Sequence, residues 1–597
     1  MIAMRTFLLI IFLSIALHGT STAQVSVPSW AKDAIWYQIF PERFRNGDTM
    51  NDPTPTDLEM GSEREWRISP WMSDWYKLQP WEERFSKRFY TNVFERRYGG
   101  DLQGVIDKLD YLSDLGITAI YFNPVFEAIS LHKYDASSYH HIDHTFGPNP
   151  RSDLELVKSE TDDPATWKWT AADSLFLKLI REAHRRGMKV IIDGVFNHSG
   201  TRFWAFRDVV KNQQRSRYAS WYDVRRWDDP TTPQNEFTYK GWWDVKELPE
   251  FWEGDSGFVK PVWNYFFNIT KRWMDPNGDG DPSDGIDGWR LDVANEVSHV
   301  FWKAWRRHVK LINPQAYIVG EIWDDAATWL KGDEFDAVMN YPFARAVVRF
   351  FIDTDARRLK PTEFDRELAS IRNDSPGEIS YVLQNLIDSH DTDRLASMIM
   401  NPNRKFDDQN GLRNNPAYNV SKPTEDARQI QKLILLFQMT YVGAPMIYYG
   451  DEAGMWGADD PDDRKPMVWG DLIYEHERTH PVAGRMRTDD EVTFDRGLFS
   501  IYKKLVSLRN ENVALRRGEF STVLADDEQN VYAFRRSAGK NELIVVLNRG
   551  SKPAKVALKI EGTQSFREEI SGRNVNAVDR LEFVLPPVTG WVFKRVE

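Results

Sequence analysis

The segment GWRLDVANEV, residues 288–297, places charged residues inside an otherwise apolar run. Successive side chains of a strand point to opposite faces, so Arg290 and Asp292 share one face. A guanidinium beside a carboxyl group favours the ionised carboxylate, which a nucleophile requires. The segment therefore predicts a buried Arg–Asp pair with a chemical task, followed at once by the polar pair Asn295 and Glu296.

Other apolar runs of the chain also end in polar residues. The segments that hold them are HKYD (132–135), DGVFNHSG (193–200), GEIW (320–323) and SHDTDR (389–394). A single carboxylate at the end of a strand usually caps neighbouring backbone N–H groups. Several carboxylates that converge on one place need another explanation, because unpaired buried charge is costly. The pattern indicates a polar site where several strands end.

Glu321 lies within the apolar run IVGEIW. Desolvation and nearby negative charge raise the pKa of a carboxyl group, which suits a general acid. Asp292 and Glu321 follow consecutive predicted strands, so the two carboxyl groups can lie ~5 Å apart, the separation found in retaining glycosidases. Asp391 supplies a third acid, and His198 and His390 can donate hydrogen bonds to sugar hydroxyl groups.

Eight apolar runs alternate with amphipathic stretches. They cover residues 34–40, 117–125, 188–196, 285–293, 316–322, 335–341, 380–388 and 444–452. Helical patterns cover residues 102–116, 174–187, 299–312 and 426–440. Such alternation predicts an α/β fold with a parallel sheet, and eight units fit a (β/α)8 TIM barrel with its active site at the carboxyl ends of the strands. A doubly wound sheet is the alternative, but no glycine-rich phosphate loop follows the first run.

The predicted domains follow from changes in this pattern. The apolar run near the N-terminus, with small residues up to Ala23, is typical of a signal peptide over residues 1–23 and is too short to span a membrane. The barrel covers 28–196 and 261–510, and the long loop 197–260 is an inserted subdomain B after the third strand. Short alternating strands over 518–597 predict an antiparallel β-sandwich.

The bulk composition excludes several classes of protein. The chain has 597 residues, a net charge of −12 and no cysteine, so nucleic acid, anionic membranes, disulfides and thiol chemistry are not expected. With the signal peptide, this predicts a secreted or periplasmic protein. Whether it is a monomer or a homodimer stays open.

In this order, DGVFNHSG, GWRLDVANEV, GEIW and SHDTDR resemble the α-amylase family of glycoside hydrolases. The resemblance covers residues 30–597 and implies Asp292 as nucleophile, Glu321 as acid/base and Asp391 as the acid that helps to distort the sugar. It implies that further residues contact the substrate or orient the nucleophile; they are Tyr134, His198, Arg290 and His390.

Asn295 and Glu296 stand where ordinary α-amylases usually carry a Lys-His pair, and VANEV looks like the neopullulanase, cyclomaltodextrinase and maltogenic amylase branch. The resemblance therefore places Asn295 and Glu296 on the leaving-group side. Arg394 is predicted as a further substrate-binding residue, and an Arg394–Asp135 pair could block one end of the site and favour exo action.

Two segments are rich in hard oxygen ligands, which suit Ca²⁺. NGDTMND offers Asn46, Asp48, Asn51 and Asp52, and the resemblance adds the Gly99 carbonyl and Asp101. An Asx-rich turn is the alternative from spacing alone. DPNGDGDPSD offers Asp275, Asn277 and Asp279 as the start of an EF-hand-type loop that lacks its closing Glu, and a solvated acidic turn stays open there.

The predicted function is hydrolysis of α-1,4-glucosidic bonds with retention, in cyclodextrins, pullulan, maltooligosaccharides or starch. Hydrolysis of α-1,6 bonds as well stays open. Three alternatives stay open: a transglycosylase on the same site, an ordinary secreted α-amylase, and a glucan-binding protein without catalysis. The last would lack Asp292 or Glu321, and both are present.

Overall fold

The computed structural model describes residues 26–58, 65–354, 357–375, 377–482 and 484–596. The predicted signal peptide lies outside these residues. Among the helices that are described, none has the length and apolar character needed to cross a membrane.

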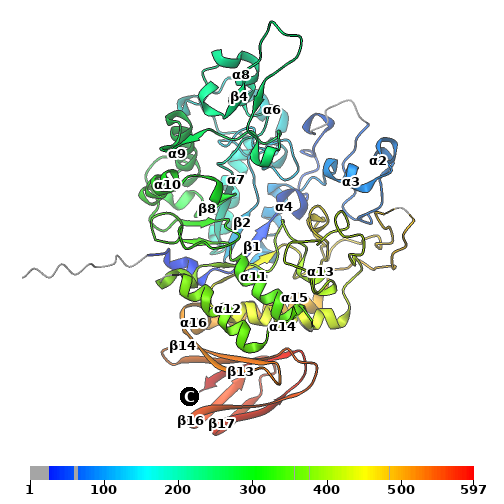
Figure 1. The fold of residues 1–597 in the computed structure, drawn as a ribbon, viewed down its shortest axis with the longest axis vertical. Helices are drawn as coiled ribbons and strands as arrows, with labels where there is room; N and C mark the ends of the chain where they lie inside the picture. The colour runs from blue at the N-terminus through cyan, green and yellow to red at the C-terminus, as the bar shows by residue number, and fades with distance from the viewer. Residues whose placement is uncertain (1–25, 59–64, 355–356, 376, 483, 597) are drawn as a thin grey trace, which may run out of the picture.

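Eight parallel strands form the barrel, as predicted (Figure 1). They are β1 (Trp36–Ile39), β2 (Ala119–Phe122), β3 (Lys189–Gly194), β8 (Gly288–Leu291), β9 (Tyr317–Gly320), β10 (Ala337–Val338), β11 (Gln384–Asn385) and β12 (Ala444–Tyr448). Their order in the sheet is β10-β9-β8-β3-β2-β1-β12-β11. A parallel bridge between Met339 and Gln384 joins the two ends and closes the barrel.

The helices that cover the barrel begin at residues suited to cap them. Thr170 and Asp173 form a capping box on α7 (Ala171–Arg185), and Ser298 caps α10 (His299–Ile312). The helix predicted over residues 102–116 is divided at Lys108 into α4 (Leu102–Asp107) and α5 (Leu109–Leu115). Gly116 ends α5 with φ 91°, a conformation that glycine adopts without penalty.

The long insertion after β3 forms a small subdomain at the carboxyl ends of the strands (Figure 1, top). It contains α8 (Trp204–Asn212), β4 (Val224–Arg226), β5 (Thr238–Tyr239), β6 (Glu253–Gly254) and β7 (Gly257–Phe258), and leads into α9 (Lys260–Met274). Aromatic side chains of Phe203, Trp221, Phe251 and Tyr265 pack together and attach it to the barrel.

The long loop after β1 has its own small core. It carries α1 (Pro41–Phe44), α2 (Pro80–Phe85) and α3 (Phe89–Asn92). Trp75, Phe89 and Tyr98 pack with Leu412 and Tyr418 from a distant loop. The long loops are thus held by apolar contacts rather than left free.

The C-terminal domain is antiparallel, as predicted. Its strands are β13 (Glu519–Asp526), β14 (Val531–Ala538), β15 (Asn541–Asn548), β16 (Ala554–Glu568), β17 (Asn574–Leu585) and β18 (Thr589–Val596). Hydrogen bonds join all six in the order β13-β14-β15-β18-β16-β17. Asp365, on α12 (Pro361–Asp374), accepts hydrogen bonds from Thr522 and Tyr532. The domain lies at the end of the barrel opposite the subdomain, away from the carboxyl ends of the strands (Figure 1).

Candidate active site

Arg290 is the centre of a charged cluster where β3, β8 and β9 end. Its Nη1 lies 3.0 Å from both carboxylate oxygens of Asp193 and 3.0 Å from Asp292 Oδ1. Its Nη2 lies 3.0 Å from Glu321 Oε2. The side chain of Arg290 is fully buried, so these contacts form out of bulk water. The predicted Arg290–Asp292 pair therefore extends to two further carboxyl groups.

The register of the parallel strands explains this meeting. Asp193 pairs with Arg290 across β3 and β8, and Leu291 pairs with Gly320 across β8 and β9. Asp292 and Glu321 directly follow Leu291 and Gly320, so they lie at the same level on neighbouring strands. Carboxyl ends of parallel strands share one edge, and this edge carries the site.

Glu321 is held by two donors. The Val293 backbone N–H donates to Glu321 Oε2 at 2.8 Å, and the Trp323 indole donates to Oε1 at 3.1 Å. Val293 adopts φ 38° and ψ 47°, a left-handed conformation that a β-branched residue rarely takes. Backbone strain of this kind concentrates at functional sites, and here it turns the N–H that follows Asp292 towards Glu321.

A second group of site residues lies next to Asp193 and consists of Tyr134, His390 and Asp391. The Tyr134 ring stacks on His390 with centroids 5.5 Å apart. Tyr134 Oη lies 3.1 Å from Asp193 Oδ2 and 2.5 Å from His390 Nε2, and His390 Nε2 lies 3.2 Å from Asp391 Oδ2. Since Tyr134 also touches Asp193, the loop after β2 and the segment after β11 converge on the Arg290 cluster.

Sequence reasoning missed two residues that hold this side in place. Gln38 Nε2, on β1, donates to His390 Nδ1 at 2.9 Å, which leaves the ring proton on Nε2, facing Asp391 and Tyr134. Arg464 donates to the His390 carbonyl at 2.7 Å and lies 3.4 Å from Asp391 Oδ1. A polar Gln38 inside an apolar strand could have been recognised from the sequence as a residue of the site. Arg464 could not, because it stands in an acidic loop where an arginine is not unusual.

His198 lies beside an aromatic pair that sequence reasoning also missed. Its ring stacks on Trp242 with centroids 5.8 Å apart, and Trp242 stacks on Trp243 at 5.3 Å. Trp243 is 78% exposed and adopts φ 47° and ψ 37°, an unfavourable backbone conformation for a large side chain. An exposed Trp held under backbone strain beside a polar site is a signal that only the structure supplies.

Asn295 and Glu296 are exposed within a short turn, η10 (Ala294–Glu296), that follows Asp292. Asn295 Nδ2 donates to Glu296 Oε1 at 3.3 Å. Both side chains are open to solvent, so a bound molecule can reach them.

Arg394 does not have the predicted role. It is fully buried and donates to the carbonyls of Asp463 at 2.8 Å and Tyr449 at 2.7 Å, and it pairs with Asp451 at 3.1 Å. Asp135 accepts instead from Ser130. The predicted Arg394–Asp135 pair and the substrate contact of Arg394 are therefore wrong, because the side chain points into the protein and holds two loops together.

The single positive charge of Arg290 faces three carboxyl groups, and the excess of negative charge, together with burial, affects the pKa values of the site. Burial, and then the nearby Glu321, raise the pKa of Asp292 well above its usual range, and Arg290 lowers it by less. Arg290 thus favours the ionised form of Asp292, in the direction expected, but burial and the charge of Glu321 act against it more strongly. Burial also raises the pKa of Asp391 to about 7 and that of Asp193 to about 6. The cluster therefore retains protons near neutral pH.

Both site histidines are neutral near pH 7. Burial lowers the pKa of His198 to about 4 and, with the nearby Arg464 and Arg290, lowers the pKa of His390 well below its usual range. A neutral imidazole has one N–H donor, which suits a hydrogen bond to a sugar hydroxyl.

The segment 46–52 meets residues 99–101 as the resemblance implied. The side-chain oxygens Asn46 Oδ1 and Asn51 Oδ1 are buried and have no hydrogen-bond donor. Burial raises the pKa of Asp52 to about 6. Gly99 approaches so closely that an added Cβ would lie 2.2 Å from Asp52 Oδ1. Buried oxygens without donors fit a hard cation.

Asp101 has a further task. It caps α4 through the Gly104 N–H at 2.6 Å and accepts from the backbone of Asp48 at 2.8 Å. Asp48 Oδ1 accepts from the Met50 N–H at 3.0 Å, as in an Asx turn. Asx-type turns and orphaned oxygens therefore occur together in this segment.

The loop 275–284 forms a ladder of Asx turns. Asn277 accepts from the Asp279 N–H and Asp279 from the Asp281 N–H, both at 2.8 Å. Asp275 Oδ1 and Asp284 Oδ1 are buried without a donor. Asp284, at the end of this loop, could therefore take the place of the closing Glu that the EF-hand pattern lacks.

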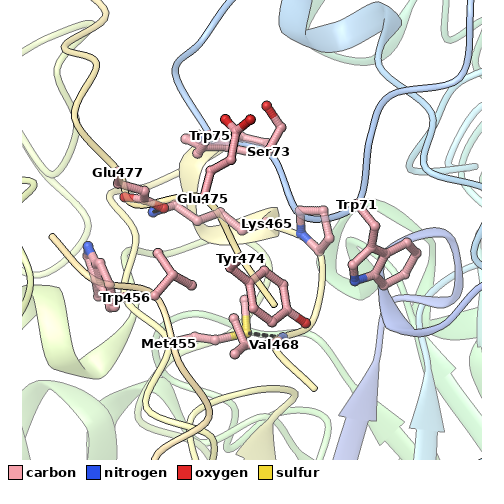
Figure 2. A pocket seen from close by; sticks show the side chains of 12 residues that line it. Trp71, Ser73, Trp75, Met455, Trp456, Lys465, Val468, Tyr474, Glu475 and Glu477 are labelled. Atoms are coloured by element: carbon pink, nitrogen blue, oxygen red, sulfur yellow. Dashed lines mark hydrogen bonds and ion pairs between the residues drawn. The ribbon is translucent and has the colours of Figure 1, made fainter. Parts of the chain in front are cut away.

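A narrow cavity lies beside Lys465, outside the Arg290 cluster (Figure 2). Trp71, Trp75, Trp456 and Tyr474 line it. It marks where the loop after β1 packs on residues 455–492.

The raised pKa of Asp391 predicts a pH-dependent stability. Folded Asp391 holds a proton up to about pH 7 whereas unfolded Asp releases it near pH 4, so its contribution is full at low pH and is lost as pH rises through 7. Asp391→Asn removes this loss. We expect its melting temperature, relative to wild type, to increase from pH 5 to pH 8, measured by calorimetry. The exposed Asp255→Asn is the control, and curves for Asp391→Asn parallel to wild type would contradict the assignment.

Comparison with known proteins agrees with this geometry. The family model of the α-amylase catalytic domain matches residues 38–161 and 170–518, and that of the maltogenic amylase C-terminal domain matches 520–589. Neopullulanase 2 of Thermoactinomyces vulgaris is 38% identical over 571 residues, covering 95% of this chain and 78% of that protein. The intracellular maltogenic amylase of Bacillus subtilis (strain 168) is 33% identical over 543 residues, covering 91% and 72%.

A solved structure of a cyclomaltodextrinase is 32% identical, covers 96% of this chain and 79% of that one, and superposes with a TM-score of 0.67. With the two family models spanning nearly the whole described chain, the comparisons show that it belongs to the α-amylase family of glycoside hydrolases.

Proposed function

We propose that this glycosidase hydrolyses α-1,4-glucosidic bonds in α-glucans with retention of configuration. One observation carries the proposal: Asp292 and Glu321 both lie 3.0 Å from the same guanidinium, that of Arg290. Two carboxyl groups that share one guanidinium at neighbouring strand ends favour the short separation of a retaining enzyme over the wider gap in which an inverting enzyme holds a water molecule.

In the reactive form of the cluster, one proton is on Glu321 and Asp292 is ionised beside Arg290. Glu321 protonates the glycosidic oxygen while Asp292 attacks the anomeric carbon, the C–O bond breaks and a glycosyl ester forms. Glu321 then accepts a proton from water, which attacks the anomeric carbon and releases Asp292. Two inversions give net retention. His390 and Asp391 hold the sugar, and Tyr134 supplies a stacking face.

Removal of either carboxyl group tests this mechanism. We expect Asp292→Asn and Glu321→Gln each to lower kcat by several orders of magnitude, because each step needs both groups, while the melting temperature stays close to wild type. NMR of the earliest product from an α-glucan should show the α-anomer. Turnover near the wild-type rate in either folded variant, or an initial β-anomer, would refute the roles.

Substrate choice is proposed from the turn after Asp292. Its exposed Glu296 can accept hydrogen bonds from sugar hydroxyl groups and orient water or an acceptor sugar. The relatives named neopullulanase and cyclomaltodextrinase lend support for pullulan and cyclodextrins as substrates, beside maltooligosaccharides and starch. Cleavage of α-1,6 bonds in pullulan and transfer to an acceptor sugar belong to the same proposal.

A substrate panel tests this part. We expect wild type to cleave cyclodextrin, pullulan or short maltooligosaccharides at least as well as soluble starch, with panose or maltose among the products. Glu296→His should shift the ratio of rates towards starch or lower transfer relative to hydrolysis, measured by chromatography of products. A wild-type enzyme that degrades starch much faster than the other substrates supports an ordinary α-amylase instead.

Trp243 is proposed as a stacking face for the glucan. The rings of His198, Trp242 and Trp243 stack in succession, so only the outer face of Trp243 remains free. The centroid distances of 5.8 and 5.3 Å place Trp243 beyond Trp242 in this stack. Aromatic faces bind the apolar faces of sugar rings, which gives the strained exposed Trp a function.

Trp243→Ala should weaken the binding of long chains more than that of short ones. We expect KM to rise about tenfold for maltohexaose, corresponding to about 1.4 kcal/mol, with maltotriose less affected and kcat nearly unchanged. Trp169→Ala, at another exposed Trp, is the matched control. An equal effect on both chain lengths would show that Trp243 acts only through folding of the subdomain.

Calcium is proposed at residues 46–101, with the same ligands as in the sequence prediction: oxygens of Asn46, Asp48, Asn51, Asp52 and Asp101, and the Gly99 carbonyl. When bound, Ca²⁺ neutralises buried oxygens and ties the loop after β1 to the barrel. Asp275, Asn277 and Asp279 are proposed as a second site.

Chelation tests both sites. EDTA should lower the melting temperature and excess Ca²⁺ restore it, because a ligand at about 100 times its Kd stabilises the folded state by roughly 2.7 kcal/mol. Asp52→Asn should lose most of the response to the first site and Asp275→Asn the remainder. A melting curve that EDTA leaves unchanged, with no calcium in the purified protein by elemental analysis, would exclude the two sites.

Export is proposed from the pattern of residues 1–23, which is typical of a cleaved signal peptide. A relative is named an intracellular maltogenic amylase, so export would distinguish this chain from that protein.

A further inference from the structure

A second polar cluster lies outside the catalytic site, on the wall of a cavity of about 410 Å³. His140 and His141 belong to the loop after β2, and Glu160 belongs to the segment before α7. His140 is 2% exposed, His141 is 4% exposed, and the Glu160 side chain is 5% exposed. None of the three takes part in the proposed reaction.

The ligating atoms of these side chains converge on one point. His140 Nε2 lies 3.1 Å and His141 Nε2 lies 2.6 Å from the same oxygen, Glu160 Oε2. One such atom from each residue lies within 4.8 Å of the others. Zinc bonds of about 2.1 Å in a tetrahedral site separate the ligand atoms by ~3.3 Å, close to the 3.1 Å between His140 Nε2 and Glu160 Oε2. The contact between His141 Nε2 and Glu160 Oε2, at 2.6 Å, must open by about 0.7 Å to admit the ion.

Each residue is oriented from behind by a separate partner. His140 Nδ1 lies 2.8 Å from Tyr265 Oη, and His141 Nδ1 lies 2.8 Å from Asp173 Oδ2. The Lys168 N–H donates to Glu160 Oε1 at 2.7 Å. Partners of this kind fix the orientation of metal-ligating histidines, and a carboxylate behind the imidazole is a recurring form.

We propose that His140, His141 and Glu160 form a zinc site. Two imidazole nitrogens and one carboxylate oxygen are a ligand set that binds Zn²⁺, and a water molecule from the cavity completes the tetrahedron. Calcium and magnesium prefer oxygen ligands throughout, so this site is distinct in chemistry from the calcium sites proposed above.

A neighbouring cluster in the same cavity lacks these features. His144 Nδ1 lies 2.8 Å from Glu127 Oε2 and its Nε2 lies 3.1 Å from Asp57 Oδ1. Asp143 pairs with Lys133 at 2.7 Å. This cluster therefore offers one imidazole nitrogen rather than two, and one of its carboxylates is already paired with an ammonium group.

The zinc would join parts of the chain that position the catalytic site. His140 follows Tyr134 by six residues in the same loop, Tyr265 belongs to α9 at the base of the subdomain, and Asp173 belongs to the first turn of α7. Its role is therefore structural, and binding itself, rather than catalytic rate, is the property to measure.

The test uses the full chain, freed of metal with EDTA and dialysed into excess Ca²⁺ so that calcium sites do not compete. Calorimetric titration with ZnCl₂ should show one zinc per chain that raises the melting temperature. Co²⁺ in place of zinc should give the visible absorption of a four-coordinate ion. His140→Gln and Glu160→Gln should abolish both signals, and Tyr265→Phe, which keeps the ring, should weaken zinc binding about 10–100-fold.

His144→Gln is the matched control, since it alters a histidine in the same cavity and should leave zinc binding unchanged. Circular dichroism verifies that each variant folds. If folded wild-type protein binds no zinc, or if Glu160→Gln and His144→Gln bind it alike, the cluster is a set of metal-free hydrogen bonds and the proposal fails. The outcome does not depend on which glucan the enzyme cleaves.

Discussion

A single buried guanidinium sets the conditions for the rest of the molecule. Arg290 touches Asp193, Asp292 and Glu321, each at 3.0 Å, in the interior of the barrel. Burying four ionisable groups is costly unless each is paired, and one positive charge cannot offset three negative ones. The excess is met by raised pKa values and by donors such as Val293 N–H and Tyr134 Oη. A cluster that keeps a proton while another carboxylate stays ionised is what acid and nucleophile together require.

The surrounding structure can be understood as the support for this cluster. The parallel ladder fixes the level of Asp292 and Glu321, and the left-handed turn at Val293 directs a donor onto the acid. Gln38 and Arg464 hold His390 and Asp391 from the other side. These contacts come from strands and loops far apart in the chain, so the site depends on barrel closure. The long loops, with their own aromatic cores, are what the cation sites at 46–101 and at His140–Glu160 would tie down.

Two buried arginines of this protein have different functions, and the sequence alone does not show which arginine has which. Arg290 lies in strand β8, and Arg394 comes after strand β11. Acidic residues are close to each of them in the sequence, and both side chains are fully buried. Arg290 faces the mouth of the barrel, whereas Arg394 binds the carbonyls of Asp463 and Tyr449 and joins two loops. Which way a side chain points after a strand depends on the turn that follows, and that is set by packing.

The sequence by itself determined the barrel, its helices and the positions of Asp292, Glu321, His390 and Asp391. Period-two and period-3.6 patterns are local, and strand ends in a parallel sheet must meet at one edge, so no long-range information was needed. The packing of the chain was needed to show that Arg394 is internal and that Arg464 and Gln38 hold the site. It was also needed to show that Trp243 stands exposed on the far side of Trp242 from His198. Those outcomes depend on the way in which the long loops pack against one another. That packing is set by many weak contacts between residues far apart in the chain, which no local pattern encodes.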